Sequence, residues 1–207
     1  MLSRLTPGED QKDKVKQARL LIEEVKKTKV EVVYGSLGRL NSLCLEIHAD
    51  ASFGNVDDKT KSTEGAVVIL RGSEGTGSPI YWRSNVIVRV CKSAKSAETC
   101  ALEDAIDTTI NIGRQVHQIR TGEIADKSCK IVAMTDSKGL IDSLSSTKQV
   151  SEGRMRLNVH RIKEYLTLKE VAMIKWVPTK SMLADSLTKS RADPSKLIKV
   201  LETGKME

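Results

Sequence analysis

Four acidic residues stand where a fold could bring their carboxylates together. Asp50 and Asp136 each follow a predicted strand, whereas Glu98 and Asp185 lie near the start of a predicted helix. Taken alone, each has a common structural explanation, since aspartates make turns after strands and carboxylates are favoured at helix N-termini. Sites in open α/β sheets gather where the strands end, so a shared position at that edge would make the four acids a functional group.

Clustered carboxylates repel one another and raise each other's pKa unless cations neutralise them. Oxygen ligands in this number suit Mg²⁺ or Mn²⁺. Two such ions ~4 Å apart can activate a water and stabilise the leaving oxygen of a phosphodiester. The four acids therefore predict a magnesium site, and this chemistry needs no histidine.

The three histidines, His48, His117 and His160, are not expected to take part. His48 faces opposite to Ile47 and Ala49 on the strand that precedes Asp50, so we expect it on the surface of the sheet. The four cysteines are scattered without a close pair, which indicates reduced thiols and not a zinc site.

The elements that must position the acids follow from the apolar pattern. Strands are expected at residues 43–49, 65–70, 80–83, 130–135 and 171–177. Short turns join the first three, which indicates an antiparallel meander. The fourth is an unbroken apolar run, typical of a parallel strand that is buried on both faces.

Helical spacing of apolar residues predicts the remaining elements. Helices are expected at residues 10–29, 96–113, 140–144, 151–168 and, capped by Ser181, around Leu187. The helix over 96–113 begins with Ser93 or Ser96 as its N-cap, and the one over 151–168 is basic.

Composition narrows the partners. The net charge of +7 favours a polyanion, and two Trp, three Tyr and one Phe leave little for stacking on bases, so a nucleic acid would be held by its backbone. The chain lacks an apolar run of ~18 residues, and its start lacks the apolar core of a secretory signal. We therefore expect no membrane segment and an intracellular location, cytoplasmic or nuclear.

Five stretches in this order resemble the ribonuclease H domain of copia-type LTR retrotransposon polyproteins. They are residues 49–53, 80–84, 96–102, 135–138 and 176–189. The last is the most specific, since it carries leucine-alanine-aspartate and leucine-threonine-lysine after a tryptophan-valine-proline turn. The resemblance covers about residues 44 to 190.

The resemblance implies an α/β, ribonuclease H-like fold: a five-stranded mixed sheet, three strands antiparallel and two parallel, flanked by helices. It places the metal ligands on Asp50, Glu98, Asp136 and Asp185, with Asp50 bridging two Mg²⁺ or Mn²⁺ ions. The implied activity is endonucleolytic cleavage of the RNA strand of an RNA–DNA hybrid, which leaves a 5′-phosphate and a 3′-hydroxyl.

A hybrid substrate requires groups that sense 2′-hydroxyls and groups that hold phosphates. Ser52 and Ser137 are short polar side chains beside two of the acids and are the candidates for the first task. The candidates for phosphate contacts are Arg83, Arg89, Lys92, Lys95, Arg154 and Arg156.

The resemblance also implies an organisation. Residues 1–41 are expected to be a helical connection appendage, 42–191 the ribonuclease H-like domain and 192–207 a C-terminal tail. The appendage is similar to the segment that follows the polymerase of a reverse transcriptase. The expected partner is therefore a polymerase region within a longer polyprotein, and virus-like particles are a further expected location. The chain would then be a polyprotein's C-terminal end, a truncated copy or a derived gene.

Two departures and two alternatives accompany this prediction. Cellular ribonucleases H carry a histidine before the last helix, but residues 178–184 hold none, which implies slower turnover. Many copia-type domains carry a histidine-rich segment, and the corresponding residues 152–157 here contain no histidine.

One alternative is a catalytically inactive retrotransposon-derived module that binds nucleic acid or protein. Another is a DNA-directed nuclease or integrase of the same superfamily, against which Glu98 and Asp185 argue.

Overall fold

The computed structural model describes residues 11–27, 30–39, 42–56, 59–73, 75–124 and 129–206. Its centre is a five-stranded sheet of order β3-β2-β1-β4-β5. The strands are β1 (Cys44–Val56), β2 (Lys61–Arg71), β3 (Gly77–Val86), β4 (Lys130–Thr135) and β5 (Met173–Trp176). The first three pair antiparallel, while β4 runs parallel to β1 and β5 parallel to β4. The predicted α/β class and mixed sheet are therefore confirmed.

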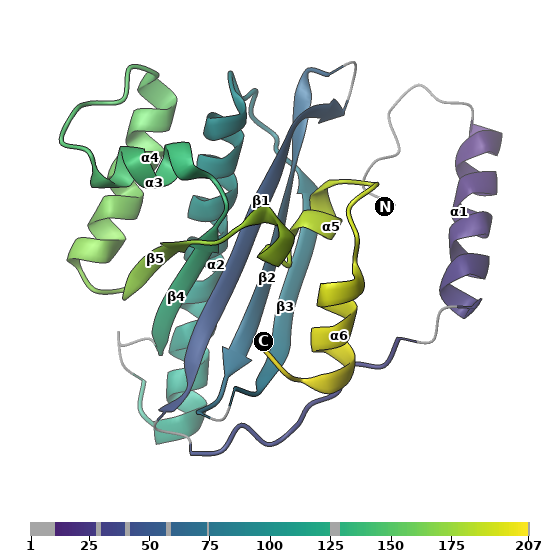
Figure 1. The fold of residues 1–207 in the computed structure, drawn as a ribbon, viewed down its shortest axis with the longest axis horizontal. Coiled ribbons are helices and arrows are strands. Elements are labelled where there is room, and N and C mark those ends of the chain that lie inside the picture. Colours follow the sequence, from purple (N-terminus) through teal and green to yellow (C-terminus); the bar gives the residue numbers. More distant parts are fainter. Residues whose placement is uncertain are drawn as a thin grey trace.

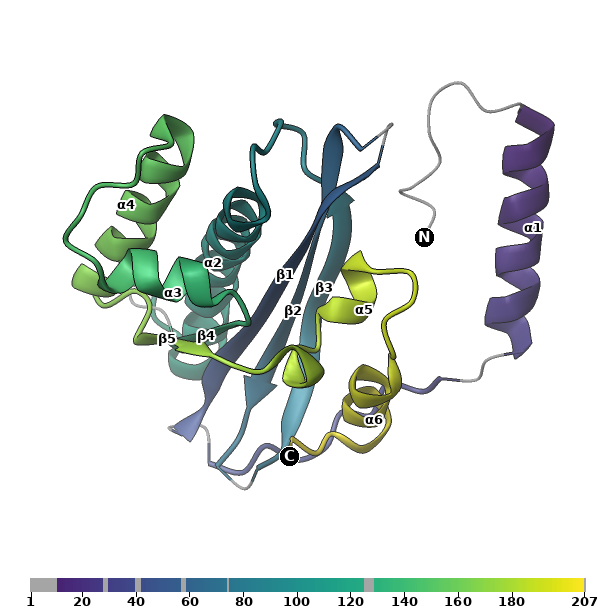
Figure 2. The ribbon, with the colours of Figure 1, turned by 45° about the horizontal axis from the view of Figure 1, so that its top comes forward.

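Helices cover both faces of the sheet (Figures 1 and 2). The described helical elements are α1 (Gln11–Lys27), which stands apart from the sheet, α2 (Ala94–Thr121), α3 (Lys138–Ser145), α4 (Gly153–Thr167), the 3-10 turn η3 (Thr179–Ser181), α5 (Asp185–Thr188) and α6 (Ser195–Thr203). The long α2 crosses one face with α4 packed beside it, whereas α5 and α6 lie on the opposite face.

The main core lies between the sheet and α2. Leu45 and Ile47 of β1 are fully buried against Leu102 and Ile106 of α2 in one apolar cluster that β4 and α4 complete. Burying each such side chain contributes about 1.5–3 kcal/mol, so this layer holds β1 and α2 in fixed relative positions.

A second, smaller core lies on the opposite face. Val67 and Ile69 of β2 pack there against Leu183 and against Val200 of α6. The segment predicted as a C-terminal tail thus forms a helix and covers the sheet, and the Gly77 N–H donates to the carbonyl of Gly204 at 2.7 Å.

This second layer corrects the prediction for His48. We expected a surface residue, but His48 is only 5% exposed. His48 lines a cavity to which α6 also contributes side chains. The polar residues that alternate along β1 therefore form a buried, charged face of the strand and not a solvated one.

Helix boundaries also differ from expectation at two places. Ser93 is the N-cap of α2, as one of the predicted alternatives, but the helix continues to Gly122, whose left-handed φ of 75° ends it. Ser181 does not cap a helix, because it closes the 3-10 turn in which the Met182 N–H donates to Thr179; α5 begins at Asp185.

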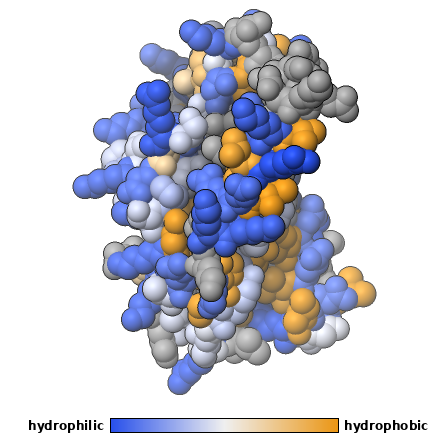
Figure 3. All heavy atoms as spheres, turned by 90° about the vertical axis from the view of Figure 1, so that its right-hand side faces the viewer, coloured by the Kyte–Doolittle hydropathy of each residue, from blue (hydrophilic) through white to orange (hydrophobic). Residues whose placement is uncertain are grey.

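The N-terminal part lies along the α6 side. The amphipathic helix predicted there forms α1, with its apolar side chains Val15, Leu20, Ile22 and Val25 exposed. Figure 3 faces this side and shows apolar patches between charged groups. The Val33 N–H donates to the carbonyl of Leu201, which ties residues 30–39 to α6. Residues 1–10, 28–29 and 40–41 of the predicted appendage lie outside the described residues. Among the described helices, none is both long and apolar enough to cross a bilayer.

Candidate functional site

Three of the four predicted acids converge at one edge of the sheet. Carboxylate oxygens of Asp50, Glu98 and Asp136 all lie within 4.8 Å of one another. The parallel register that pairs His48 with Met134 brings the two aspartates to the same level, because each follows its paired residue by two positions. Glu98 reaches the same point from the first turns of α2. The sequence prediction of a carboxylate cluster is thereby realised for these three residues.

Asp50 is the buried centre of the cluster, with no exposed surface. One carboxylate oxygen accepts a hydrogen bond from the Thr188 hydroxyl, and the other lies 3.3 Å from the Lys189 ammonium. Burial raises the pKa of Asp50, although Thr188 and Lys189 act in the opposite direction. Both partners come from the α5 end, so α5 fixes the orientation of this carboxylate.

The charge of Glu98 is the least compensated of the three carboxylates. Burial, followed by the negative charges of Asp50 and Asp136, raises its pKa to about 9. A backbone hydrogen bond with Ala51 lowers that pKa in part, yet the buried Oε2 has no hydrogen-bond partner within the described part of the chain. An orphaned carboxylate oxygen beside two other carboxylates fits a hard divalent ion with oxygen ligands.

Asp136 is positioned by the end of β5. Its Oδ2 accepts from the Thr179 hydroxyl at 2.7 Å, and its backbone carbonyl accepts from the Trp176 indole N–H at 3.0 Å. The Lys138 ammonium lies 4.9 Å from the centre of the Trp176 ring. Tryptophan and threonine thus hold the loop after β4 in place.

Asp185 joins the site through a lysine and lies outside the group of three. It forms an ion pair with Lys189, one helical turn later, and Lys189 also faces Asp50. Burial lowers the pKa of Lys189, but its bonds with Asp185 and Asp50 outweigh burial and raise it overall. A single ammonium therefore bridges two of the four acids.

Gly65 allows α5 to approach. It pairs with Asp50 across β1 and β2, and a Cβ placed there would lie 2.8 Å from the Thr188 methyl and 2.9 Å from the Leu187 Cβ. A side chain at this position would push Thr188 away from Asp50, so the absence of one is part of how the site is built.

Sequence reasoning missed Thr179, Thr188 and Lys189 as site residues. Lys189 could have been found, because it stands four residues after Asp185, the spacing of an ion pair on a helix. Thr188 carries no such signal, since its contact with Asp50 spans 138 residues and depends on the packing of α5.

The nucleic-acid candidates fall into two groups. Ser52 and Ser137 are half-buried beside Asp50 and Asp136, while Lys92 is exposed and Lys95 lies 3.4 Å from the Ser143 hydroxyl. Arg154 and Arg156 are exposed on α4. All six remain predictions.

Arg83 and Arg89 have acidic partners. Arg83 lies 3.1 Å from Glu64, and Arg89 lies 3.6 Å from Glu103 and 3.8 Å from Asp104. A phosphate contact by either arginine would therefore compete with an ion pair already present, and their role also remains a prediction.

Comparison with known proteins gives a fold. No protein-family model matches the chain, and no curated protein does. The structure is similar to RNase H1 from the halophilic archaeon Halobacterium salinarum, with a TM-score of 0.50 and 17% identity over 70% of this chain and 94% of that one. It is also similar to LC11-RNase H1 from compost, solved with an RNA/DNA hybrid, with a TM-score of 0.49 and 15% identity over 74% of this chain and 99% of that one. A foamy viral protease-reverse transcriptase solved with dsDNA is similar with a TM-score of 0.48 and 17% identity over 75% of this chain and 96% of that one.

Proposed function

We propose that this chain, which has the ribonuclease H-like fold, is a metal-dependent endonuclease that cleaves the RNA strand of RNA–DNA hybrids. The observation that carries the proposal is the convergence of Asp50, Glu98 and Asp136, with a buried carboxylate oxygen that has no partner among the described residues. The order of motifs adds the second part of the proposal, an origin in a copia-type LTR retrotransposon polyprotein.

The three clustered acids would hold the metal, and Asp50 would be shared between two ions. Asp185 would contribute through its ion pair with Lys189. Two Mg²⁺ or Mn²⁺ ions in such a site supply an activated water and stabilise the leaving oxygen of the phosphodiester. The donor set fits, because it consists of carboxylate oxygens alone and carries more negative charge than Lys189 balances.

The chain's own residues provide the fixed geometry. Thr188 orients Asp50, Thr179 and Trp176 orient Asp136, and the Ala51 backbone holds Glu98. Pre-set ligands need no reorganisation when charge develops during the reaction, which is the main source of rate in electrostatic catalysis.

The proposed substrate contacts are those expected from the sequence. Ser52 and Ser137 flank the cluster and would reach 2′-hydroxyls of the RNA strand, and the exposed Lys92, Arg154 and Arg156 would contact phosphates. A reverse transcriptase polymerase region in a longer polyprotein is the proposed partner, and virus-like particles, cytoplasm or nucleus the proposed location.

The test is cleavage of a labelled RNA–DNA hybrid in Mg²⁺, beside single-stranded RNA and duplex DNA. We expect cutting of the hybrid alone, with loss in Asp136→Asn and retention in Asp142→Asn, a matched control at an exposed aspartate of α3. Salt-sensitive hybrid binding without cleavage would instead identify an inactive binding module. Equal cleavage by Asp136→Asn would show that the site lies elsewhere.

A further inference from the structure

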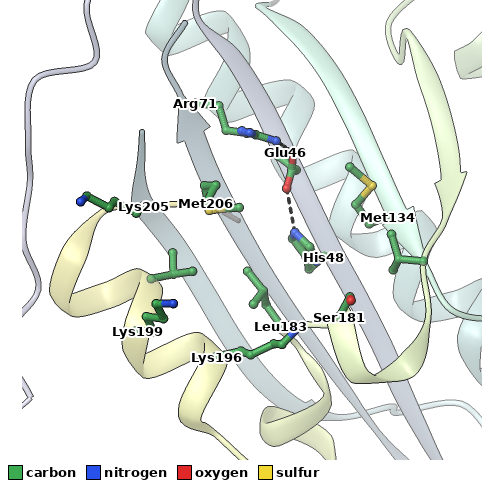
Figure 4. Close-up of a pocket in the computed structure, with 12 residues that line it drawn as sticks. Glu46, His48, Arg71, Met134, Ser181, Leu183, Lys196, Lys199, Lys205 and Met206 are labelled. Atoms are coloured by element: carbon green, nitrogen blue, oxygen red, sulfur yellow. Dashed lines mark hydrogen bonds and ion pairs between the residues drawn. The ribbon is translucent and has the colours of Figure 1, made fainter. Parts of the chain in front are cut away.

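A cavity of about 210 Å³ lies between the sheet and α6 (Figure 4). Lys196 and Lys199 lie along one side of it, Met134 and Ser181 along the other, and the Glu46–His48 pair lies between them. None of the acids Asp50, Glu98, Asp136 and Asp185 lines it. This cavity is therefore a second place where the fold gathers charged groups.

The inner end of the cavity is a self-neutralised network. His48 Nε2 lies 2.9 Å from one oxygen of Glu46, and Arg71 donates to the other at 2.6 Å. Burial would raise the pKa of Glu46, but these two partners outweigh it and lower the pKa. Because both carboxylate oxygens are occupied, Glu46 presents little free negative charge to a ligand.

The outer side is cationic. Lys196 and Lys199 are exposed residues that line the cavity from α6. The ammonium of Lys205 points away from the other lining residues in Figure 4, and the charge of Arg71 is paired with Glu46. Positive side chains that converge on a concave, partly apolar wall raise the local concentration of anions. A ligand with a charge of about −2 at neutral pH, as a phosphate monoester has, balances such a set better than a single carboxylate does.

Apart from Ser181, the rest of the lining is apolar: Met134, Val177, Leu183, Val200 and Met206. A bare inorganic ion would lose hydration against these side chains and gain few partners, whereas an apolar body would fill the space. The volume of about 210 Å³ equals that of about seven waters, which suits one small ring or a short chain.

We propose that this cavity binds a small organic phosphate, an apolar group that carries one phosphate monoester. The phosphate lies against Lys196 and Lys199 of α6, and the apolar group packs on Met134 and Leu183. The proposal does not depend on hybrid cleavage, since the cavity shares no residue with the acid cluster.

The test is isothermal titration of the full chain with phenyl phosphate, beside inorganic phosphate and phenol. We expect one binding site and at least tenfold weaker binding of each control compound. The Lys196→Gln/Lys199→Gln variant should lose about tenfold or more, the effect of one charge-assisted hydrogen bond. The matched control is Lys26→Gln/Lys27→Gln, the same charge change at exposed positions of α1, which should bind as the wild type does.

A second variant tests the cavity itself. Ser181→Phe adds a ring at a half-buried lining position and should abolish phenyl phosphate binding, while circular dichroism stays unchanged. Retained binding in a folded Ser181→Phe variant, or equal binding of inorganic phosphate, would overturn the proposal. So would loss of hybrid affinity in the α6 lysine variant without phenyl phosphate binding by the wild type, because that surface would then be a nucleic-acid contact.

Discussion

Two charged clusters lie on the same face of β1 and differ in how their charge is balanced. Glu46 and His48 stand four and two residues before Asp50, so all three side chains project to the α5–α6 side. Glu46 has His48 and Arg71 as partners at hydrogen-bond distance. Asp50 lies 3.3 Å from Lys189, whose charge also acts on Glu98, and Asp136 adds a third negative charge. The carboxylate of the first cluster has both oxygens paired, although the buried His48 Nδ1 has no hydrogen-bond partner among the described residues. The second cluster is built to receive positive charge.

The pKa values of the two clusters express this difference. Burial acts on Glu46 and Glu98 in the same direction, yet the pKa of Glu46 is lowered and that of Glu98 is raised to about 9. A buried carboxylate costs stability unless it is paired. The uncompensated cluster therefore lowers the stability of the metal-free protein, which a purely structural site would not do.

Asp50→Asn should have the largest effect. It removes the proposed shared ligand while the amide oxygen can still accept from Thr188. We expect hybrid cleavage to fall by about three orders of magnitude or more, since several kcal/mol of charge stabilisation are lost. Single-turnover cleavage assays in Mg²⁺ measure this, and an undiminished rate would place Asp50 among structural residues.

Arg71→Met should have the largest effect on stability in the other cluster. It leaves Glu46 buried with one partner in place of two. Because the Arg71 side chain is 31% exposed, we expect a loss of about 2 kcal/mol in the free energy of unfolding, less than for a fully buried pair. Urea denaturation measures it. The double variant Arg71→Met/Glu46→Gln should recover part of the loss, and no recovery would contradict the assigned pairing.

Glu98→Gln should raise stability in the absence of metal. The folded pKa of about 9 lies above the ordinary value of 4.5, so between these pH values the folded protein holds a proton that the unfolded chain has released. The free energy of unfolding of the wild type therefore falls as the pH rises through this window. Glutamine does not ionise and removes the fall.

Thermal denaturation in EDTA from pH 4 to 9 tests this. The melting temperatures of wild type and Glu98→Gln should coincide near pH 4 and separate toward pH 9, by roughly 2–4 °C for each kcal/mol. Mg²⁺ should close the gap by stabilising the wild type alone. Parallel curves at all pH values would mean that the pKa of Glu98 is not raised in the folded protein.

The comparison also marks how far the sequence could lead. Alternation around Leu45 and Ile47 predicted the buried strand, and the ends of two strands predicted that Asp50 and Asp136 would meet, because both are local patterns read against a sheet. Glu46 and His48 follow the same alternation, and His48 was expected on the surface. What buries them is α6, about 150 residues later in the chain, and a short helix with exposed lysines gives no local sign of where it packs.

Lys189→Gln should have the smallest effect of the four, and it bears directly on the comparison. Lys189 is the ion-pair partner of Asp50 and Asp185, just as Arg71 and His48 are the partners of Glu46. In both clusters, therefore, a side chain of the protein supplies positive charge to the acids. The Lys189 ammonium repels any cation bound among the acids. Removing that charge should therefore tighten Mg²⁺ binding at least several-fold in calorimetry at low salt, because two unit charges about 4 Å apart interact by roughly 1 kcal/mol even at the dielectric constant of bulk water. Lys92→Gln, at an exposed lysine before α2, is the matched control and should bind Mg²⁺ as the wild type does. If Lys189→Gln weakened Mg²⁺ binding instead, the lysine would act by holding Asp185 and Asp50 in place, and the second cluster would be more like the first than its charges suggest.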